Sequence, residues 1–263
     1  MLERIGETAA KNRYITQPLR LFVASFRSSL KLLELSKYAL DVVIRLPNLT
    51  AKVLSISEEM GRPSDQLVGE LQGSERAIEF IAEERKSGFP FLHAHTFVAT
   101  WGSLEAAIED ALVGILLNEP DMFAKDIFAR VKIPVSKFDA LNREERIRFV
   151  LSEVARNHIN IGHGVDAFEP MLDLLELSGT VGAATRKTMW EMNHVRNVIV
   201  HRDSRADSRL VQNCPWLGLK VGDKVCIDEK TFREYTQALL TYVETVIDRL
   251  LVRYVPRHVV TRQ

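Results

Sequence analysis

The chain has few of the features that would assign it to a secreted, disulfide-bonded or membrane-embedded class of protein. Only two of its 263 residues are cysteines, Cys214 and Cys226, so no disulfide framework is expected, and a reducing cytoplasm is favoured. No run of about 18 apolar residues occurs, which argues against a membrane span. The first residues lack the apolar core of a secretory signal, so we expect a cytoplasmic protein without a membrane partner.

An excess of charge of either sign is also absent. The chain contains 35 lysine and arginine residues and 35 aspartate and glutamate residues, which gives a formal net charge of zero. This balance does not suggest a general electrostatic coat for nucleic acid, so any RNA site must be a local basic patch.

Motifs for bound metals, phosphates and cofactors are missing as well. The sequence has no glycine-rich phosphate loop, no serine triad motif and no paired-carboxylate metal motif. His93 and His95 are two residues apart, and His158 and His163 are five apart; neither spacing gives a helical metal pair. We therefore expect neither a metal nor a cofactor.

The chain does contain apolar residues at helical spacing, and they make up 46% of its composition, enough for a substantial core. The longest predicted helix covers residues 17–46 and ends at Pro47-Asn48. Further helices are predicted over residues 91–118, 143–157, 183–201 and 228–254.

A single β-element is predicted near the C-terminal end of the chain. Leu217–Val221 and Lys224–Ile227 flank Gly222-Asp223, which is typical of a small β-hairpin with a tight turn. The predicted fold class is therefore all-α, a helical bundle with one small β-hairpin insertion and an N-terminal helical extension.

The most informative stretch is Arg196-Asn197-Val198-Ile199-Val200-His201, at the C-terminal end of a predicted helix. Arginine carries a permanent cation with five N–H donors, and histidine exchanges a proton near neutral pH, so together they can act on a phosphodiester without a metal. Five residues turn an ideal helix by about 500°, which leaves Arg196 and His201 roughly 140° apart. They converge only if the helix frays near His201, if the arginine bends round, or if a second copy completes the site.

Glu105 is an acidic residue within the apolar stripe of the predicted helix over residues 91–118. A carboxylate on such a face needs a partner, because burying it alone is costly. Since Arg196 lies on the apolar side of its own helix, we expect Glu105 and Arg196 to approach each other and the pair to position the arginine. The alternatives are that Glu105 reaches the edge of the bundle or pairs with Arg186 or Lys187.

Several basic residues follow the motif, and a phosphate-binding patch for RNA is one interpretation of them. They are Arg202, Arg205, Arg209, Lys220 and Lys224. The other interpretation is a solvated loop in which Asp203 and Asp207 neutralise the cations. For Arg196 and His201, the alternative to a functional site is a basic cap on the C-terminal end of the helix. We expect His194 to face solvent.

Arg196, Asn197 and His201 match the R-polar-x-x-x-H signature of the HEPN (higher eukaryotes and prokaryotes nucleotide-binding) domain family. The setting is similar too: a helix with Met189-Trp190-Glu191-Met192, the motif, a polar loop and a long final helix, so the chain resembles this family over roughly residues 89–255. The resemblance implies an all-α bundle, usually dimeric, with the two motifs meeting in a cleft at the dimer interface. Many members are metal-independent endoribonucleases that act as toxins or phage-defence effectors, whereas others only bind RNA or nucleotides.

Taken with the resemblance, the sequence predicts an N-terminal helical segment (1–88), a HEPN-like bundle (89–255) and a tail (256–263). The expected function is RNA cleavage by a homodimer in a bacterial toxin or defence setting, with an antitoxin or a defence-system protein as a further partner. One alternative is a non-catalytic HEPN module that binds RNA, nucleotide or protein. Another is a structural adaptor that dimerises through residues 17–46.

The roles of the motif residues follow the same expectation. His201 would be the general base for the RNA 2′-hydroxyl or the general acid for the leaving 5′-oxygen, and Arg196 would stabilise charge on the phosphoryl oxygens. Asn197 would orient the phosphate or the histidine. The products implied are a 2′,3′-cyclic phosphate and a 5′-hydroxyl.

Overall fold

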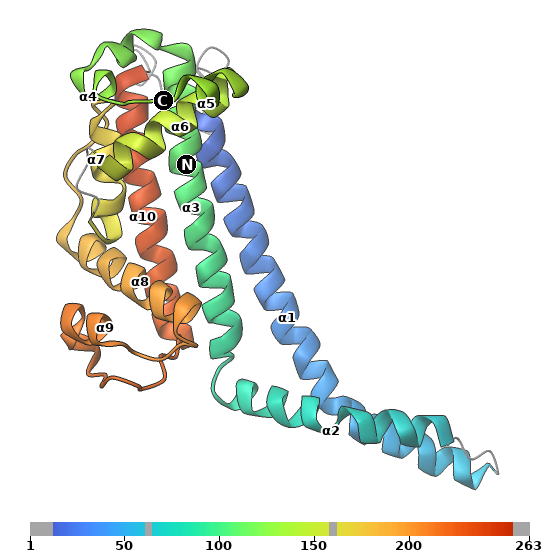
Figure 1. Cartoon of the computed structure of the whole chain (residues 1–263). Coiled ribbons are helices and arrows are strands. Elements are labelled where there is room, and N and C mark those ends of the chain that lie inside the picture. The colour runs from blue at the N-terminus through green and yellow to red at the C-terminus, as the bar shows by residue number, and fades with distance from the viewer. Residues whose placement is uncertain (1–12, 61–64, 158–161, 255–263) are drawn as a thin grey trace, which may run out of the picture. The chain divides into compact units, whose positions relative to one another are not determined.

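The computed structural model describes residues 13–60, 65–157 and 162–254 of the chain (Figure 1). These residues form ten α-helices and three 3-10 helices (η), and no β-strand is present among them, which confirms the predicted all-α class. In the described part of the chain, no helix is long and apolar enough to cross a membrane. The elements are α1 (Arg13–Glu59), α2 (Asp65–Lys86), α3 (Pro90–Asn118), η3 (Pro120–Ala124), α4 (Asp126–Ala129), α5 (Val135–Ala140), α6 (Arg143–Asn157), η4 (Gly164–Ala167), α7 (Glu169–Asp173), α8 (Ala183–His201), α9 (Ser208–Asn213), η5 (Pro215–Leu217) and α10 (Glu229–Tyr254).

Contacts between residues divide the chain into two compact units. The smaller unit contains the described parts of Arg27–Thr96 and Cys226–Phe232. The larger unit contains the described parts of Met1–Phe26, Phe97–Val225 and Arg233–Gln263. The predicted segment boundaries after residues 88 and 255 stay predictions, and the predicted tail lies outside the described residues.

The core of the larger unit is built on α3. Most of the predicted apolar stripe of this helix is buried, namely Phe97, Trp101, Leu104, Ile108, Leu112 and Ile115. Phe97 packs against Tyr235 of α10, with ring centroids 5.1 Å apart, and Tyr235 donates a hydrogen bond of 2.7 Å to Glu191 of α8. Because burial of large apolar side chains is the main driving force of folding, this core fixes α3 and α10 as the scaffold on which α8 lies.

The first turns of α1 also belong to the larger unit. Leu19 and Phe22 are buried, with 1% and 2% of their surface exposed. At Gly114 of α3, an added Cβ atom would lie 2.8 Å from the carbonyl oxygen of Tyr14, so the missing side chain allows the two helices to approach closely. The larger unit is thus built from segments far apart in the sequence.

The motif helix α8 is held against η4 by a backbone contact. Gly164 opens η4 with a φ of +62°, in the left-handed region that favours glycine. An added Cβ atom there would lie 2.6 Å from the backbone nitrogen of Trp190 in α8. Glycine at this position therefore allows the backbones of η4 and α8 to pack directly on each other.

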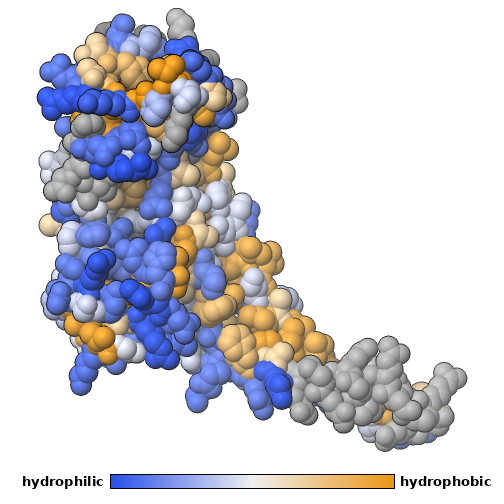
Figure 2. Space-filling view, in the orientation of Figure 1, coloured by the Kyte–Doolittle hydropathy of each residue, from blue (hydrophilic) through white to orange (hydrophobic). Residues whose placement is uncertain are grey.

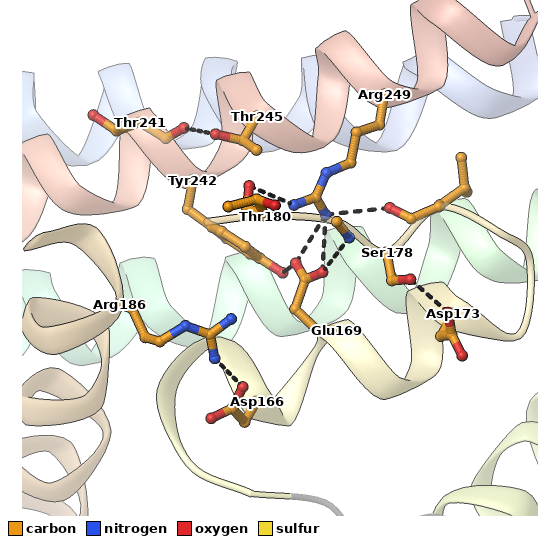
Figure 3. Close-up of polar contacts among 12 residues, drawn as sticks. Asp166, Glu169, Asp173, Ser178, Thr180, Arg186, Thr241, Tyr242, Thr245 and Arg249 are labelled. Carbon is orange, nitrogen blue, oxygen red and sulfur yellow. Dashed lines mark hydrogen bonds and ion pairs between the residues drawn. The ribbon is translucent and has the colours of Figure 1, made fainter. Parts of the chain in front are cut away.

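A buried ion pair joins α10 to α7 and the loop that follows it (Figure 3). Arg249 Nη1 lies 2.9 Å and 3.0 Å from the two carboxylate oxygens of Glu169 and also donates to the carbonyl of Leu177. The carboxylate accepts further hydrogen bonds from the Tyr242 hydroxyl, at 2.9 Å, and the Gly179 N–H, at 3.0 Å. Such a satisfied network is what allows a carboxylate to be buried, and it anchors the middle of α10.

The smaller unit has a polar centre formed by Lys37, His93 and Glu229. Lys37 Nζ and His93 Nε2 lie 2.9 Å and 3.2 Å from the same carboxylate oxygen of Glu229, and His93 Nδ1 lies 3.1 Å from the carbonyl oxygen of Ile227. His93 is fully buried and stacks on Phe232, with ring centroids 4.8 Å apart. Burial lowers the pKa of His93, and the charge of Lys37 lowers it further. The hydrogen bond to Ile227 and the Glu229 carboxylate oppose this shift of the His93 pKa.

The structure corrects the predicted end of the first helix. α1 runs without interruption to Glu59, so the predicted stop at Pro47-Asn48 is wrong. Pro47 lacks the N–H that would bond to the carbonyl of Val43, and this loss normally breaks or kinks a helix. Apolar residues keep their helical spacing on both sides of the proline, and Leu40 and Ile44 before it and Leu54 after it are half-buried in the smaller unit. This packing holds the helix together across the proline.

The predicted β-hairpin is also wrong: within the described residues, the segment after α9 forms no strand. A turn does form, since Asp223 N donates to the carbonyl of Lys220 at 3.1 Å and Gly222 has a φ of +93°. The chain after this turn pairs instead with the loop that follows α8, where Ala206 N donates to Asp223 O at 2.8 Å and Val225 N to Ser204 O at 2.7 Å. These tertiary hydrogen bonds use the backbone groups that a local hairpin would need.

Candidate functional site

The motif lies at the C-terminal end of α8, as predicted. The helix is regular up to His201, and its carbonyl at Val198 accepts hydrogen bonds from the N–H groups of both Arg202 and Ser204. Asp203 and Ser204 have φ values of +51° and +56°, a left-handed conformation that ends the helix. Because α8 does not fray before His201, Arg196 and His201 keep the wide angular separation of an ideal helix. Fraying of the helix therefore does not bring the two side chains together within one chain.

Arg196 is held in place from α3. Its Nη2 lies 3.6 Å from Glu105 Oε2, which confirms the predicted approach of these two side chains. The other oxygen of Glu105 accepts a hydrogen bond of 2.8 Å from the indole N–H of Trp101, a fully buried residue. Arg196 Nη1 donates to the side-chain oxygen of Asn197 at 3.3 Å. The arginine is therefore positioned by a carboxylate that a buried tryptophan orients.

The two motif side chains differ in their access to solvent. Arg196 keeps 28% of its side-chain surface, and its Nε atom is buried without a hydrogen-bond acceptor among the described residues. His201 is exposed at the end of the helix. A fixed guanidinium can hold charge on a phosphate, and an open imidazole can move a proton, which are two roles in metal-independent cleavage of a phosphodiester.

The basic residues after the motif are all exposed: Arg202, Arg205, Arg209, Lys220 and Lys224. Arg205 and Lys224 are paired by an isolated antiparallel bridge, and Arg205 N donates to the carbonyl of Arg202. The structure thus gathers three of the five in the paired loops. Arg209 lies on α9, and Lys220 lies in the turn before Gly222, where its N–H donates to the Asp223 carboxylate at 2.8 Å.

Sequence reasoning missed an exposed aromatic residue near α8. Trp216 keeps 44% of its surface, and its indole N–H donates to Glu191, the same carboxylate that accepts from Tyr235. Lys187 Nζ lies 4.5 Å from the centroid of the Trp216 ring. An aromatic face beside a lysine is a surface on which a nucleic-acid base can stack. The only sign in the sequence is a tryptophan within a polar loop.

His194 is buried, with 5% of its surface exposed, so its predicted exposure to solvent is wrong. Its ring packs against His163 and Trp190, with centroids 4.6 Å and 5.2 Å away, because η4 and the segment before it cover this side of α8. Burial lowers the pKa of His194, and the proximity of His163 lowers it further, whereas the Asp207 carboxylate opposes the shift.

This shift predicts a pH-dependent stability. The folded chain favours the neutral His194 imidazole, so the unfolded chain binds a proton there at a higher pH than the folded chain does. The contribution of His194 to the free energy of unfolding is therefore fully present above about pH 6.5 and falls below that pH. The midpoint of urea unfolding should therefore drop between about pH 7.5 and about pH 5.5, and His194→Phe should reduce that drop. The same change at the exposed His95 is the matched control. An equal drop in the natural chain and in His194→Phe would rule out the effect.

No protein-family model, curated protein or solved structure matches this chain. Among the described residues, no group of three or more histidine, cysteine, aspartate or glutamate side chains is placed to hold a metal ion. The resemblance to the HEPN family thus rests on Arg196, Asn197 and His201 and on their helical setting.

Proposed function

We propose that this chain is a metal-independent endoribonuclease of the HEPN type that acts as a homodimer. The observation that carries the proposal is the contrast between two side chains of α8. Arg196 is held 3.6 Å from Glu105, and His201 stands exposed at the end of the same helix. A cation of fixed position and a solvent-accessible imidazole are suited to a reaction that builds negative charge on phosphate while a proton moves.

The reaction needs no group beyond RNA and the side chains. The 2′-hydroxyl attacks the adjacent phosphorus and gives its proton to one His201 imidazole. The bond from phosphorus to the 5′-oxygen breaks, and that oxygen takes a proton from a second, protonated imidazole. The products are a 2′,3′-cyclic phosphate and a 5′-hydroxyl. Arg196 stabilises the charge on the phosphoryl oxygens, and Asn197 orients the guanidinium through its side-chain oxygen.

The helical geometry supports a site made by two copies of the chain. α8 stays helical through His201, so a single copy keeps Arg196 and His201 on different sides of the helix. One copy also offers one motif histidine, whereas the reaction uses an acid and a base. Two copies meeting at the ends of their α8 helices would supply both.

The exposed cations after the motif support RNA as the substrate. Arg202, Arg205 and Lys224 lie in the paired loops directly beyond His201, where they can contact the phosphates that flank the cleaved bond. Cleavage of cellular RNA fits a bacterial toxin or phage-defence effector that an antitoxin or a defence-system protein restrains.

The proposal is tested by incubating the purified protein with end-labelled single-stranded RNA in the presence of EDTA. We expect cleavage that leaves a 2′,3′-cyclic phosphate and a 5′-hydroxyl, and no cleavage where the scissile nucleotide carries a 2′-deoxyribose. Cleavage that disappears in EDTA would contradict the metal-independent mechanism. RNA binding without cleavage would contradict the nuclease and favour the non-catalytic binding module.

A further inference from the structure

The outer face of α1 is apolar and exposed over most of its part in the smaller unit. Eight large apolar side chains keep 40–71% of their surface: Leu32, Leu35, Val42, Leu46, Leu49, Val53 and Ile56 in α1, and Met60 directly after its last residue. Figure 2 displays hydrophobic side chains along the course of α1. Scattered apolar residues on a surface are ordinary, whereas a continuous apolar face marks an interaction site.

The spacing of these residues is that of a coiled coil. From residue 32 to residue 60 they follow one another at alternating steps of three and four, with Ala39 filling the single remaining position. In heptad notation, positions a are 32, 39, 46, 53 and 60, and positions d are 35, 42, 49 and 56. We call these nine positions the α1 seam. A repeat of seven keeps the seam on one side of a supercoiled helix, so it is suited to pairing with another helix along its length.

The inner face of α1 is already used, which makes the seam a second face. Leu33 is buried, and Leu40 and Ile44 are half-buried within the smaller unit. Pro47 belongs to this inner row, at heptad position b, away from the seam. A partner on the seam would therefore leave the packing of α1 in its own chain unchanged.

The extent of the seam matches what a stable interface needs. Eight large side chains exposed to this degree present on the order of 800 Å² of apolar surface, which is about what one partner contributes to an interface of standard size. The described helix carries the pattern over four heptads, and short coiled coils require about that length.

The charges beside the seam indicate which partner and which direction. Positions g are Lys31, Tyr38, Arg45, Lys52 and Glu59, whereas positions e hold no charge: Ser36, Val43, Thr50 and Ser57. In a parallel pair of identical helices, position g faces position e of the other helix, so each cation would face an uncharged side chain. In an antiparallel pair that covers the whole seam, position g faces position g, so Lys31 would meet Glu59 but Arg45 would meet the Arg45 of the other copy. Two copies of α1 therefore avoid like-charge contacts when they pair in parallel.

We infer that the α1 seam pairs in parallel with the α1 seam of a second copy of this chain. This interface lies in the smaller unit and uses none of the residues assigned to RNA cleavage, so it does not depend on the proposed function. Each seam residue would face its own counterpart, and the apolar face would be removed from water on both chains.

Disulfide trapping of the full-length protein tests the register and the direction. In a Cys226→Ser background, which removes the exposed cysteine, Ile56→Cys places a thiol at position d, where two identical positions lie within disulfide reach in a parallel pair. Mild oxidation should convert most of this variant into a covalent species of twice the 29.9 kDa of one chain. Ser55→Cys, the exposed neighbour off the seam, is the matched control and should remain a single chain.

Charge substitution gives an independent measurement that separates this interface from the dimer proposed for cleavage. Leu49→Glu on the seam should lower the extent of Ile56→Cys cross-linking at least tenfold, whereas Asn48→Glu beside the seam should leave it unchanged. Both sites are exposed, so a helical spectrum like that of the natural chain is expected for each variant. Equal cross-linking at residues 55 and 56, or no cross-linking at either, would overturn the inference. RNA cleavage has no part in either readout.

Discussion

Replacing His201 with alanine is expected to lower the rate of RNA cleavage by about 10²- to 10⁴-fold, the usual contribution of a general acid or base. The side chain is exposed at the end of α8, so the fold should be kept. Arg196→Ala is expected to lower the rate by about 10²- to 10³-fold, because it removes the cation that stabilises the phosphoryl oxygens. Single-turnover rates on end-labelled RNA measure both effects.

The matched control for these variants is His95→Ala, another exposed histidine, which lies in the smaller unit outside the proposed site. It should cleave RNA at the rate of the natural chain. Circular dichroism and thermal unfolding of the motif variants separate a chemical effect from loss of structure. A folded His201→Ala variant that cleaves at the full rate would refute the role of this histidine.

Glu169→Ala is expected to destabilise the larger unit by about 3 to 5 kcal/mol, because it leaves the Arg249 guanidinium buried without its partner. Arg249 keeps only 15% of its side-chain surface, and the substitution also removes the acceptor of the Tyr242 hydroxyl and of the Gly179 N–H. Urea unfolding followed by the tryptophan fluorescence of the full chain measures the loss.

The same Glu→Ala change at Glu176 is the control for this prediction. Glu176 is exposed and pairs with Lys125 and Arg253 at the surface, and those cations lower the pKa of its carboxyl group. Surface pairs contribute little to stability, so this variant should unfold much closer to the natural chain. Equal losses for the two variants would show that burial of the Glu169–Arg249 pair has no special effect on stability.

Helical periodicity predicted the parts of the candidate site that depend on one helix face. Glu105 is an acidic residue within the apolar stripe of α3, and a carboxylate in that position needs a partner, which Arg196 provides. The observed 3.6 Å contact follows from that reasoning. The helix end at His201 was predictable for a similar reason, because a polar segment follows the last apolar residue of α8.

The features that sequence reasoning missed all depend on contacts with distant segments. The residues after Gly222 satisfy both a hairpin pattern and the observed pairing with Ser204 and Ala206, and only the tertiary hydrogen bonds decide between them. Pro47 is compatible with a helix because packing in the smaller unit supports both sides of it. His194 is buried by η4, an element whose position on α8 depends on the missing side chain of Gly164.

The way the larger unit combines α1 and α10 constrains when this protein becomes ordered during synthesis. Leu19 and Leu250 are buried in the same unit, although more than 200 residues separate them. A growing chain cannot complete this core until α10 has left the ribosome, since Tyr235 and Arg249 supply the bonds that hold α8 and α7. The motif helix consequently gains its support only after translation has passed α10.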